Sequence, residues 1–357
     1  MEEPLKKTTK IVAAFAAAAL AFGVAPAATA ANATKACLAL DTGGVDDKSF
    51  NASAWAGANA AKKANANVSV SYLAAATDAD YAPNIKKLVD NGCDIIIGVG
   101  FLINSAIVDA AKKNPSVKFA IVDQDGEDHG ADGSVYPGKK IANLKPLEFA
   151  TNESAFQAGY LAAGVSKTGK VATYGGLNIP PVTIFMDGFA KGVAHYNAKK
   201  GKSVQVLGWD TKKADGTFVG GFSDSAKALQ ISKNFEQQGA DVIFPVAGGL
   251  GGATAGNSIA SKKSVVIWVD TDGFVAAPQY KKVLLTSVVK GVDTSVKGVI
   301  LDVANNKFSS TGYVGTLKNG GTKLAPYHDL IRMVPSALRS EVTKLGTDIS
   351  NKKVSVK

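Results

Sequence analysis

The sequence predicts an α/β protein made of two lobes with a ligand cleft between them. Short β-branched runs alternate with helical segments, and a second series of the same kind begins after residues 143–145. This strand–helix–strand order is typical of parallel βαβ units and open sheets covered on both faces. The length of 357 residues exceeds one ordinary core, which also indicates two domains.

Apolar runs and helical spacing place the elements of the first half. The predicted strands cover residues 38–41, 68–73, 94–98 and 117–123. The predicted helices between them cover residues 50–64, 81–90 and 103–113.

The second half repeats the pattern. It is expected to begin with a helix at 153–166 and to contain strands at 171–174, 204–208, 241–246 and 265–270. Helices are expected at 183–196, 225–238 and 254–261, and a last strand at 283–287 leads into a helix that ends near residue 305.

The first thirty residues are expected to be a secretory signal peptide, 1–30. Three lysines precede the apolar run 11–25, and Ala28-Thr29-Ala30 offers a small-x-small cleavage site. No other stretch approaches the ~20 apolar residues of a spanning helix. We therefore expect an exported protein. Cys37 lies well past the apolar run and follows Lys35-Ala36, which argues against a lipid anchor; lipid attachment is the alternative.

The charge pattern argues against nucleic-acid binding. The net charge is +10, but only Arg332 and Arg339 are arginines and the lysines are dispersed. Base and phosphate readers rely on arginine because its planar fork bonds two acceptors at once. A lysine-rich solvated surface explains the charge better.

The predicted strands end in glycine, aspartate and aromatic residues. In open parallel sheets, ligands bind outside the carboxyl ends of the strands, where glycine allows close approach and polar side chains orient the ligand. These ends are 41–44, 98–101, 123–125, 175–176, 208–210, 247–249 and 270–272.

Catalytic signatures are absent from the sequence. The three histidines are scattered, no G-x-S-x-G motif follows a strand, and the glycines of 248–252 lack a P-loop lysine. Asp46-Asp47 could be a catalytic or metal pair, but helix capping explains it more simply. We therefore expect ligand capture, with neither enzyme activity nor a cofactor or metal.

Eight motifs follow one another in order from about residue 36 to the end of the chain: GGVDDKSFNASAW, DIIIGVGF, FAIVDQD, GGLNIPPVTIFMDGFAKGV, ADVIFPVAGGLGGAT, WVDTDG, LTSVVKGVD and YVGTLKNGGTKLAP. Together they resemble the motifs of the basic membrane protein family, the purine nucleoside-binding components of ABC importers. The resemblance implies a type I periplasmic-binding-protein fold with two Rossmann-like lobes joined by three crossovers.

The resemblance also implies partners and lobe boundaries. We expect a monomer that serves an ABC permease and its ATPase and meets the membrane only through that permease or a lipid anchor. The first lobe is expected at 36–145 plus 274–308, and the second at 146–273 plus 309–357.

By the same resemblance, Asn51 contacts a nucleobase and Trp55, four residues along one helix face, stacks on it. Core packing is the alternative for Trp55. Phe222 resembles the aromatic that closes the stack from the other lobe, with a hydrophobic staple as its alternative. Asp47 or Ser49 is expected to cap the helix that begins beside them.

The remaining site residues lie at predicted strand ends. Asp123 suits the edge of a purine ring, and Phe101 lies at the end of its own strand. The resemblance assigns Asp270 to ribose hydroxyls, with Lys290 and the Gly249 backbone completing the ribose site.

No phosphate clamp and no arginine for an α-carboxylate is evident, which favours an uncharged nucleoside over a nucleotide or amino acid. A neutral sugar or a nucleoside-like signal remains an alternative ligand. A nucleoside hydrolase would need a metal or general-acid cluster that the sequence does not show.

The two cysteines are expected to form a disulfide. Cys37 opens the first predicted strand and Cys93 the third, and these strands are neighbours in a 2-1-3-4-5 sheet. Neighbouring strands are ~4.8 Å apart, within disulfide range, and export permits the bond. Two buried thiols are the alternative.

Overall fold

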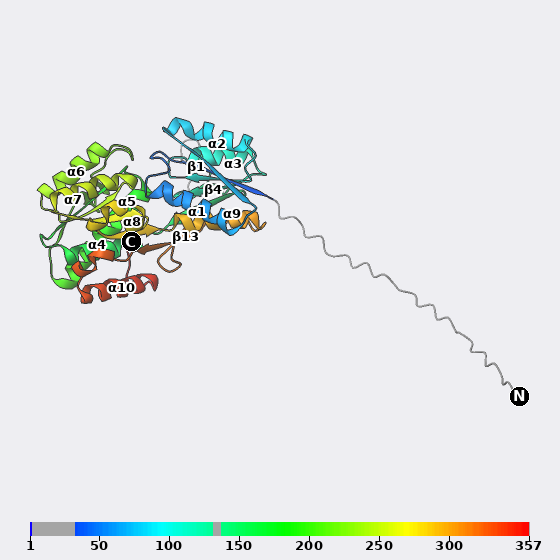
Figure 1. The fold of residues 1–357 in the computed structure, drawn as a ribbon. Coiled ribbons are helices and arrows are strands. Elements are labelled where there is room, and N and C mark those ends of the chain that lie inside the picture. Colours follow the sequence, from blue (N-terminus) through cyan, green and yellow to red (C-terminus); the bar gives the residue numbers. More distant parts are fainter. Residues whose placement is uncertain (2–32, 131–136, 357) are drawn as a thin grey trace. The chain divides into compact units, whose positions relative to one another are not determined.

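The computed structural model describes residues 1, 33–130 and 137–356 and contains two parallel-rich sheets, each with its own helices (Figure 1). Except for Met1, the predicted signal peptide lies outside the described residues. Among the residues that are described, no helix has the length and apolar character needed to cross a bilayer.

The first sheet is fully parallel, with the strand order β2-β1-β3-β4-β5-β13. The predicted order of its first five strands is therefore confirmed. Its strands are β1 (Thr34–Leu40), β2 (Val68–Ala74), β3 (Ile95–Val99), β4 (Lys118–Val122), β5 (Leu144–Phe149) and β13 (Tyr313–Gly315).

Two helices cover each face of this sheet. Helices α1 (Phe50–Ala64) and α9 (Val292–Ala304) share one core cluster, and α2 (Tyr81–Asp90) and α3 (Asn104–Lys113) share the other. Although far apart in sequence, α1 and α9 lie side by side (Figure 1). Glycine permits this contact, because a Cβ on Gly57 would lie 2.3 Å from the Asp293 carbonyl oxygen.

The second sheet has the order β14-β12-β11-β10-β6-β7, with only β14 antiparallel. Its strands are β6 (Lys170–Gly175), β7 (Gln205–Leu207), β10 (Val242–Val246), β11 (Val265–Asp270), β12 (Leu284–Lys290) and β14 (Thr322–Leu324). A small hairpin, β8 (Trp209–Asp210) and β9 (Asp215–Gly216), lies next to β6.

The helices of the second sheet again form two layers. The larger core cluster contains α4 (Asn152–Val165), α5 (Pro180–Lys200) and α10 (Ser336–Ser350), and the clusters on the other face contain α6 (Ser225–Gln237) and α7 (Gly251–Ser261). The short elements are α8 (Gly273–Ala276), η1 (Asp78–Asp80), η2 (Gly248–Leu250), η3 (Pro278–Val283) and η4 (His328–Met333).

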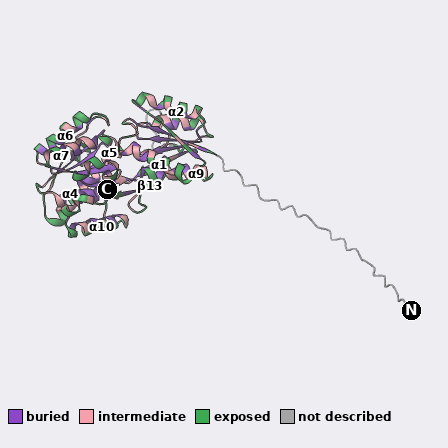
Figure 2. Cartoon of the chain, in the orientation of Figure 1, coloured by how far each residue is buried: buried purple, intermediate pink, exposed green. Residues whose placement is uncertain are grey.

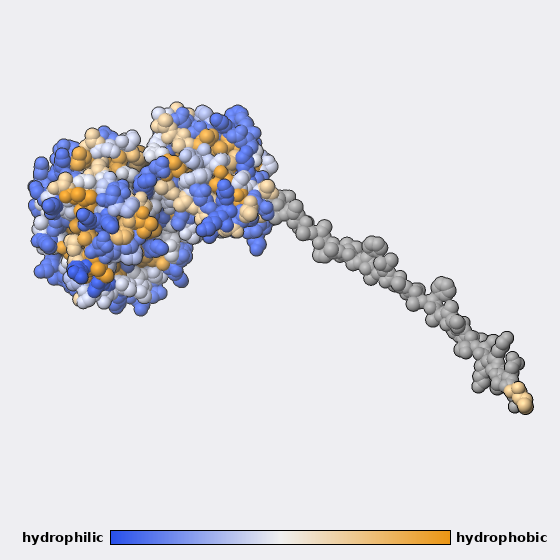
Figure 3. All heavy atoms as spheres, viewed as in Figure 1, coloured by the Kyte–Doolittle hydropathy of each residue, from blue (hydrophilic) through white to orange (hydrophobic). Residues whose placement is uncertain are grey.

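Burial follows this layering, with buried residues concentrated in the strands and on the inner helix faces (Figure 2). The visible outer face is mostly hydrophilic with scattered apolar residues, as a lysine-rich solvated surface would be (Figure 3).

The expected lobe boundaries need correction. Residues 274–291 belong to the second lobe, because β12 pairs with β11 and β14. The first lobe extends through β5 to residue 149 and also takes β13, because these two strands pair with each other. Periodicity identifies a strand without showing which sheet it joins, and the hydrogen-bonded neighbours decide that. The chain crosses between the lobes near residues 150, 291 and 316.

A disulfide joins Cys37 to Cys93, with their Cα atoms 6.1 Å apart. The expected positions differ in detail. Cys37 lies in the middle of β1, because this strand starts earlier than predicted. Cys93 precedes β3. Both cysteines are buried in the core between the sheet and helices α2 and α3.

Candidate functional site

A cavity of about 340 Å³ is lined by residues from both lobes at the carboxyl ends of the strands. This is the location predicted from the strand ends. Most of the predicted site residues contribute to the lining: Asp47, Asn51, Phe101, Asp123, Phe222, Gly249, Asp270 and Lys290.

Aromatic side chains reach this cavity from both lobes. Phe50, at the start of α1, and Phe101 belong to the first lobe, and Phe185 of α5 and Phe222 belong to the second. Phe222 lies directly on the backbone at Gly176, where an added Cβ would be 2.3 Å from its ring. The cavity therefore offers apolar faces suited to a flat ligand.

Trp55 does not line the cavity, and its contacts are those of the alternative, core packing. Its ring lies edge-on to Tyr72 with centroids 4.9 Å apart and packs against the core of the first lobe. Helix α1 runs away from the strand ends, and one turn advances ~5.4 Å along the axis. Phe50, at the first position of α1, is the aromatic that reaches the cavity instead. The position of Phe50 directly before Asn51 in the sequence is the signal that points to it.

Asn51 presents an unused acceptor. Its Nδ2 donates to the carbonyl oxygens of Asp41 and Thr42, both at 3.3 Å. Its Oδ1 is buried and has no hydrogen-bond partner among the described residues. A buried polar atom without a partner is costly, so this oxygen is well suited to accept a hydrogen bond from a ligand.

Asp47 lines the cavity, but its carboxylate is already hydrogen-bonded within the first lobe. It accepts the backbone N–H groups of Ser49, Asn51 and Ala52 at 2.9, 2.9 and 3.0 Å. Of the two caps that the sequence offered, Asp47 satisfies the free amides at the start of α1, and the Ser49 side chain does not. Burial raises the pKa of Asp47, and these amides act against that rise.

Lys290 and Asp123 form an ion pair between the lobes. The Lys290 Nζ lies 2.5 Å from Asp123 Oδ2, with side-chain exposures of 3% and 8%. The ammonium also lies 5.0 to 5.6 Å from the ring centroids of Phe50, Phe149 and Phe185. Burial raises the pKa of Asp123, and the Lys290 charge opposes this.

Asp270 is buried at the end of β11 with 6% exposed. Its Oδ2 accepts a hydrogen bond from the Ser49 hydroxyl at 2.7 Å. Burial raises the pKa of Asp270 to about 6, while Lys290 and Ser49 act in the opposite direction. A carboxylate held this way can accept hydrogen bonds from ligand hydroxyls.

Asp123 and Asp270 share an unusual backbone conformation. Their φ angles are 69° and 66°, in the left-handed region that non-glycine residues seldom adopt. Asp123 directly follows β4, and Asp270 is the last residue of β11. Such strain is concentrated at functional sites, and here it accompanies two carboxylates that line the same cavity.

Asp41 is a cavity residue that sequence reasoning did not single out beyond its place at a strand end. It accepts hydrogen bonds from the Tyr81 hydroxyl and, at 2.6 Å, from the Thr42 amide. Burial raises the pKa of Asp41. Gly100 leaves room for this carboxylate, since a Cβ there would lie 2.3 Å from Asp41 Oδ2.

Two predicted strand ends do not line the cavity. Gly175-Gly176 supports Phe218 and Phe222 from behind. Gly208-Trp209-Asp210 turns away into the β8–β9 hairpin, where Trp209 packs against Phe218. The chain leaves β7 after Leu207, so its end is directed away from the cavity.

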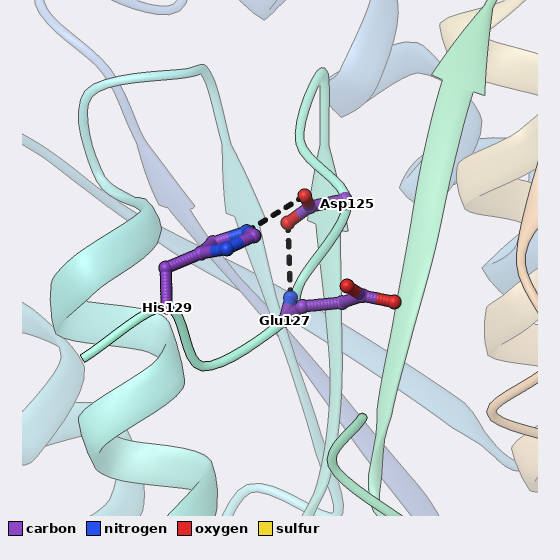
Figure 4. Close-up of side chains that lie close together, drawn as sticks. All are labelled: Asp125, Glu127 and His129. Atoms are coloured by element: carbon purple, nitrogen blue, oxygen red, sulfur yellow. Dashed lines mark hydrogen bonds and ion pairs between the residues drawn. The ribbon is translucent and has the colours of Figure 1, made fainter. Parts of the chain in front are cut away.

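A second group of polar side chains lies on the loop after β4 (Figure 4). His129 Nε2 lies 2.8 Å from Asp125 Oδ2, and Asp125 Oδ1 accepts the Glu127 amide at 3.0 Å. Together these three residues have ligand atoms close enough for a cation. Their hydrogen bonds within the loop already account for the geometry, and the group is not part of the cavity lining.

The chain matches known proteins along almost all of its described length. Residues 34–357 match the family described as "ABC transporter substrate-binding protein PnrA-like". A Lactococcus lactis protein named "ABC transporter nucleoside-binding protein BmpA" is 33% identical over 339 residues, covering 90% of this chain and 88% of its own.

This chain belongs to the PnrA-like family.

A second sequence relative and a solved structure are also similar to this chain. A Listeria monocytogenes protein named "CD4+ T-cell-stimulating antigen" is 34% identical over 273 residues, covering 72% of this chain and 70% of its own. The solved structure of an ABC transporter solute-binding protein from Aeropyrum pernix K1 has a TM-score of 0.76 at 22% identity, covering 90% of this chain and 92% of its own. The predicted type I periplasmic-binding-protein fold is confirmed.

Membership assigns a general role. A PnrA-like protein is the substrate-binding component of an ABC transporter, which implies a small-molecule ligand and, as partners, a permease and its ATPase. Such components typically work outside the cytoplasm. The two-lobed cavity is the part of this chain suited to hold that ligand.

Proposed function

We propose that this chain captures a purine nucleoside outside the cytoplasm and delivers it to an ABC importer. The observation that carries the proposal is the pairing of aromatic faces from both lobes with a floor of hydrogen-bond acceptors in one cavity. Flat bases stack on such faces, and carboxylates accept hydroxyl donors. The relative named as nucleoside-binding supports this ligand class.

The charges of the cavity support an uncharged ligand. Its charged lining residues are Asp41, Asp47, Asp123, Asp270 and Lys290. Four carboxylates face one ammonium, which is itself paired with Asp123. A phosphate group would meet net negative charge in a buried site, where repulsion is poorly screened. Nucleotides are therefore expected to bind much more weakly than nucleosides.

Individual contacts can be assigned within this proposal. Phe50 and Phe222 would hold the base between the lobes, and the unused Asn51 Oδ1 would accept an N–H from it. Asp123 would serve the edge of the base, Asp270 would accept ribose hydroxyls, and Lys290 with the backbone at Gly249 would complete the ribose site.

A ligand panel tests the proposal. Purified protein is screened by thermal shift with guanosine, adenosine, inosine, their free bases, ribose, neutral hexoses and adenosine monophosphate, and each hit is measured by calorimetry. We expect the purine nucleosides to give the largest shifts. Binding of a hexose or of ribose without binding of any nucleoside would replace the proposal with a sugar-binding role.

A further inference from the structure

Residues 48 and 49, between β1 and α1, make direct contact with the second lobe. Ser49 is fully buried, with 0% exposed, and does not line the ligand cavity. Its hydroxyl lies 2.7 Å from Asp270 Oδ2 and 3.2 Å from the Val269 carbonyl oxygen. A hydroxyl has one proton to donate, and the carboxylate is the nearer and stronger acceptor. Ser49 therefore serves a residue of the other lobe.

Lys48, the residue before Ser49, makes further hydrogen bonds to the second lobe. The Lys48 carbonyl oxygen accepts hydrogen bonds from Thr271 Oγ1 at 2.7 Å and from Trp268 Nε1 at 3.4 Å, both in the second lobe. Lys48 has a φ of 57°, a strained value for a residue with a Cβ. Strain of this kind persists where the surroundings impose it, and here hydrogen bonds from the second lobe are made to this very peptide.

The backbones also meet beside this contact. A Cβ added to Gly249 would lie 2.9 Å from the Asp47 carbonyl oxygen. The segment 47–49 thus touches the second lobe at two strand ends, those of β10 and β11. Its position relative to Asp270 is defined by several independent contacts.

Ser49 is the one described residue that hydrogen-bonds to the Asp270 carboxylate. Because Oδ2 is held by this donor, Oδ1 is left for other partners. If the lobes separate, the carboxylate loses its donor while it remains in the second lobe. The orientation of Asp270 is thereby linked to closure of the cavity.

We propose that Ser49 is a positioning residue that orients the Asp270 carboxylate for its ligand and couples that orientation to the approach of the two lobes. It acts through Asp270 and does not touch the ligand. The inference rests on the proposed function in that the ligand is taken to be a riboside.

Several charged groups face Asp270 and must be considered in its titration. They are Lys290 from β12, Asp123 at the end of β4 and Asp47 before α1. Burial raises the pKa of Asp270 to about 6, and the Ser49 hydrogen bond opposes that rise. Loss of the hydroxyl should raise the pKa further, because the charged form loses a donor.

The first test compares Ser49→Ala with a matched control, Ser53→Ala. Ser53 lies one turn further along α1, is 5% exposed, and its hydroxyl accepts the Asp293 amide within the first lobe. Calorimetry with the tightest-binding nucleoside of the panel should show affinity reduced about 10- to 100-fold in Ser49→Ala. The control should stay within about threefold of the parent protein. Equal losses in both variants would make Ser49 a residue of the fold and overturn the proposal.

The second test needs no ligand, so it remains decisive if no nucleoside binds. The Asp270 carboxyl is followed by carbon-13 NMR between pH 4 and 8 in protein labelled at aspartate, with Asp270→Asn identifying its signal. We expect Ser49→Ala to raise the titration midpoint by about one unit and Ser53→Ala to leave it in place. An unchanged midpoint in Ser49→Ala would overturn the proposal, whereas a shifted midpoint without nucleoside binding would overturn only the proposed function.

Discussion

Lys290 and Asp123 join the two lobes by a buried ion pair, with Nζ and Oδ2 2.5 Å apart. Lys290 ends β12 of the second sheet, and Asp123 follows β4 of the first. The same ammonium lies near three phenylalanine rings and lowers the pKa of both Asp123 and Asp270, against the opposing effect of burial. Lys290 is therefore the counter-charge of both Asp123 and Asp270.

Removal of this counter-charge should be costly. In Lys290→Met, two buried carboxylates lose their cation, and the loss of one member of a buried pair destabilises a fold by ~3–5 kcal/mol. We expect a lower free energy of unfolding in urea and a loss of nucleoside affinity. The double variant Lys290→Met/Asp123→Asn should recover part of the stability. Lys344→Met, which affects a pair whose lysine is 71% exposed, should change stability little; a similar loss there would contradict the assignment.

Substitution of the aromatic residues should distinguish side chains that contact the ligand from side chains that only pack in the core. Phe50→Ala and Phe222→Ala should each weaken nucleoside binding by ~1–3 kcal/mol through lost stacking. Trp55→Ala should leave the affinity unchanged and lower only the thermal stability, because its ring contacts Tyr72 and not the cavity. Calorimetry and circular dichroism on the three variants check this. A loss of affinity confined to Trp55→Ala would contradict this prediction and favour stacking of Trp55 on the base.

Asp270 should discriminate ribosides from bases. Asp270→Asn keeps the shape and removes the charge, so hydroxyl donors lose a charged acceptor. We expect a large loss of affinity for the riboside and a much smaller one for the free base or a dideoxy analogue. Equal losses for all three ligands would assign Asp270 to the fold or the base pocket.

Asp270 should also make the stability of the ligand-free protein depend on pH. Its pKa in the folded protein is about 6 against an ordinary 3.8, so the folded state binds the proton more tightly. The free energy of unfolding should therefore fall as the pH rises from about 4 to 6, by ~3 kcal/mol for this group alone, and stay lower above that range. In Asp270→Asn, the free energy of unfolding measured in urea should depend less steeply on pH between about 4 and 6. The same pH dependence of the unfolding free energy in the parent protein and in Asp270→Asn would contradict the prediction.

Ligand binding should respond to pH in the opposite sense. An ionised Asp270 accepts hydroxyl donors better than a protonated one, so nucleoside affinity should decline as the pH falls through about 6. Calorimetry from pH 5 to 8 measures this decline. Asp270→Asn serves as its control and should show much less of it.

The disulfide can be checked chemically. The bond between Cys37 and Cys93 joins residues with a sequence separation of 56. In the chain-entropy model, such a cross-link stabilises the folded state by ~4 kcal/mol. Intact mass after alkylation without reductant should show no labelled thiol in the purified protein. The double variant Cys37→Ser/Cys93→Ser should unfold at a lower urea concentration. Two labelled thiols in the parent protein would refute the pairing.

The sequence by itself determined the α/β class, most element positions and the side of the sheets where the cavity lies. Helices α1 and α2 begin and end at the predicted residues, because their apolar spacing and flanking polar residues are local signals. The aspartates at the ends of β1, β4 and β11 were visible for the same reason, since parallel strands place their carboxyl ends on one edge.

Tertiary structure decided what no local pattern contains. Which lobe β12 joins depends on its hydrogen-bonded neighbours, and the aromatic residue of α1 that reaches the cavity depends on the direction of that helix. The contact of Ser49 with Asp270 joins residues 221 positions apart. Such partners are selected by packing across the whole chain, because burial and hydrogen bonding between distant segments leave no periodicity in the sequence.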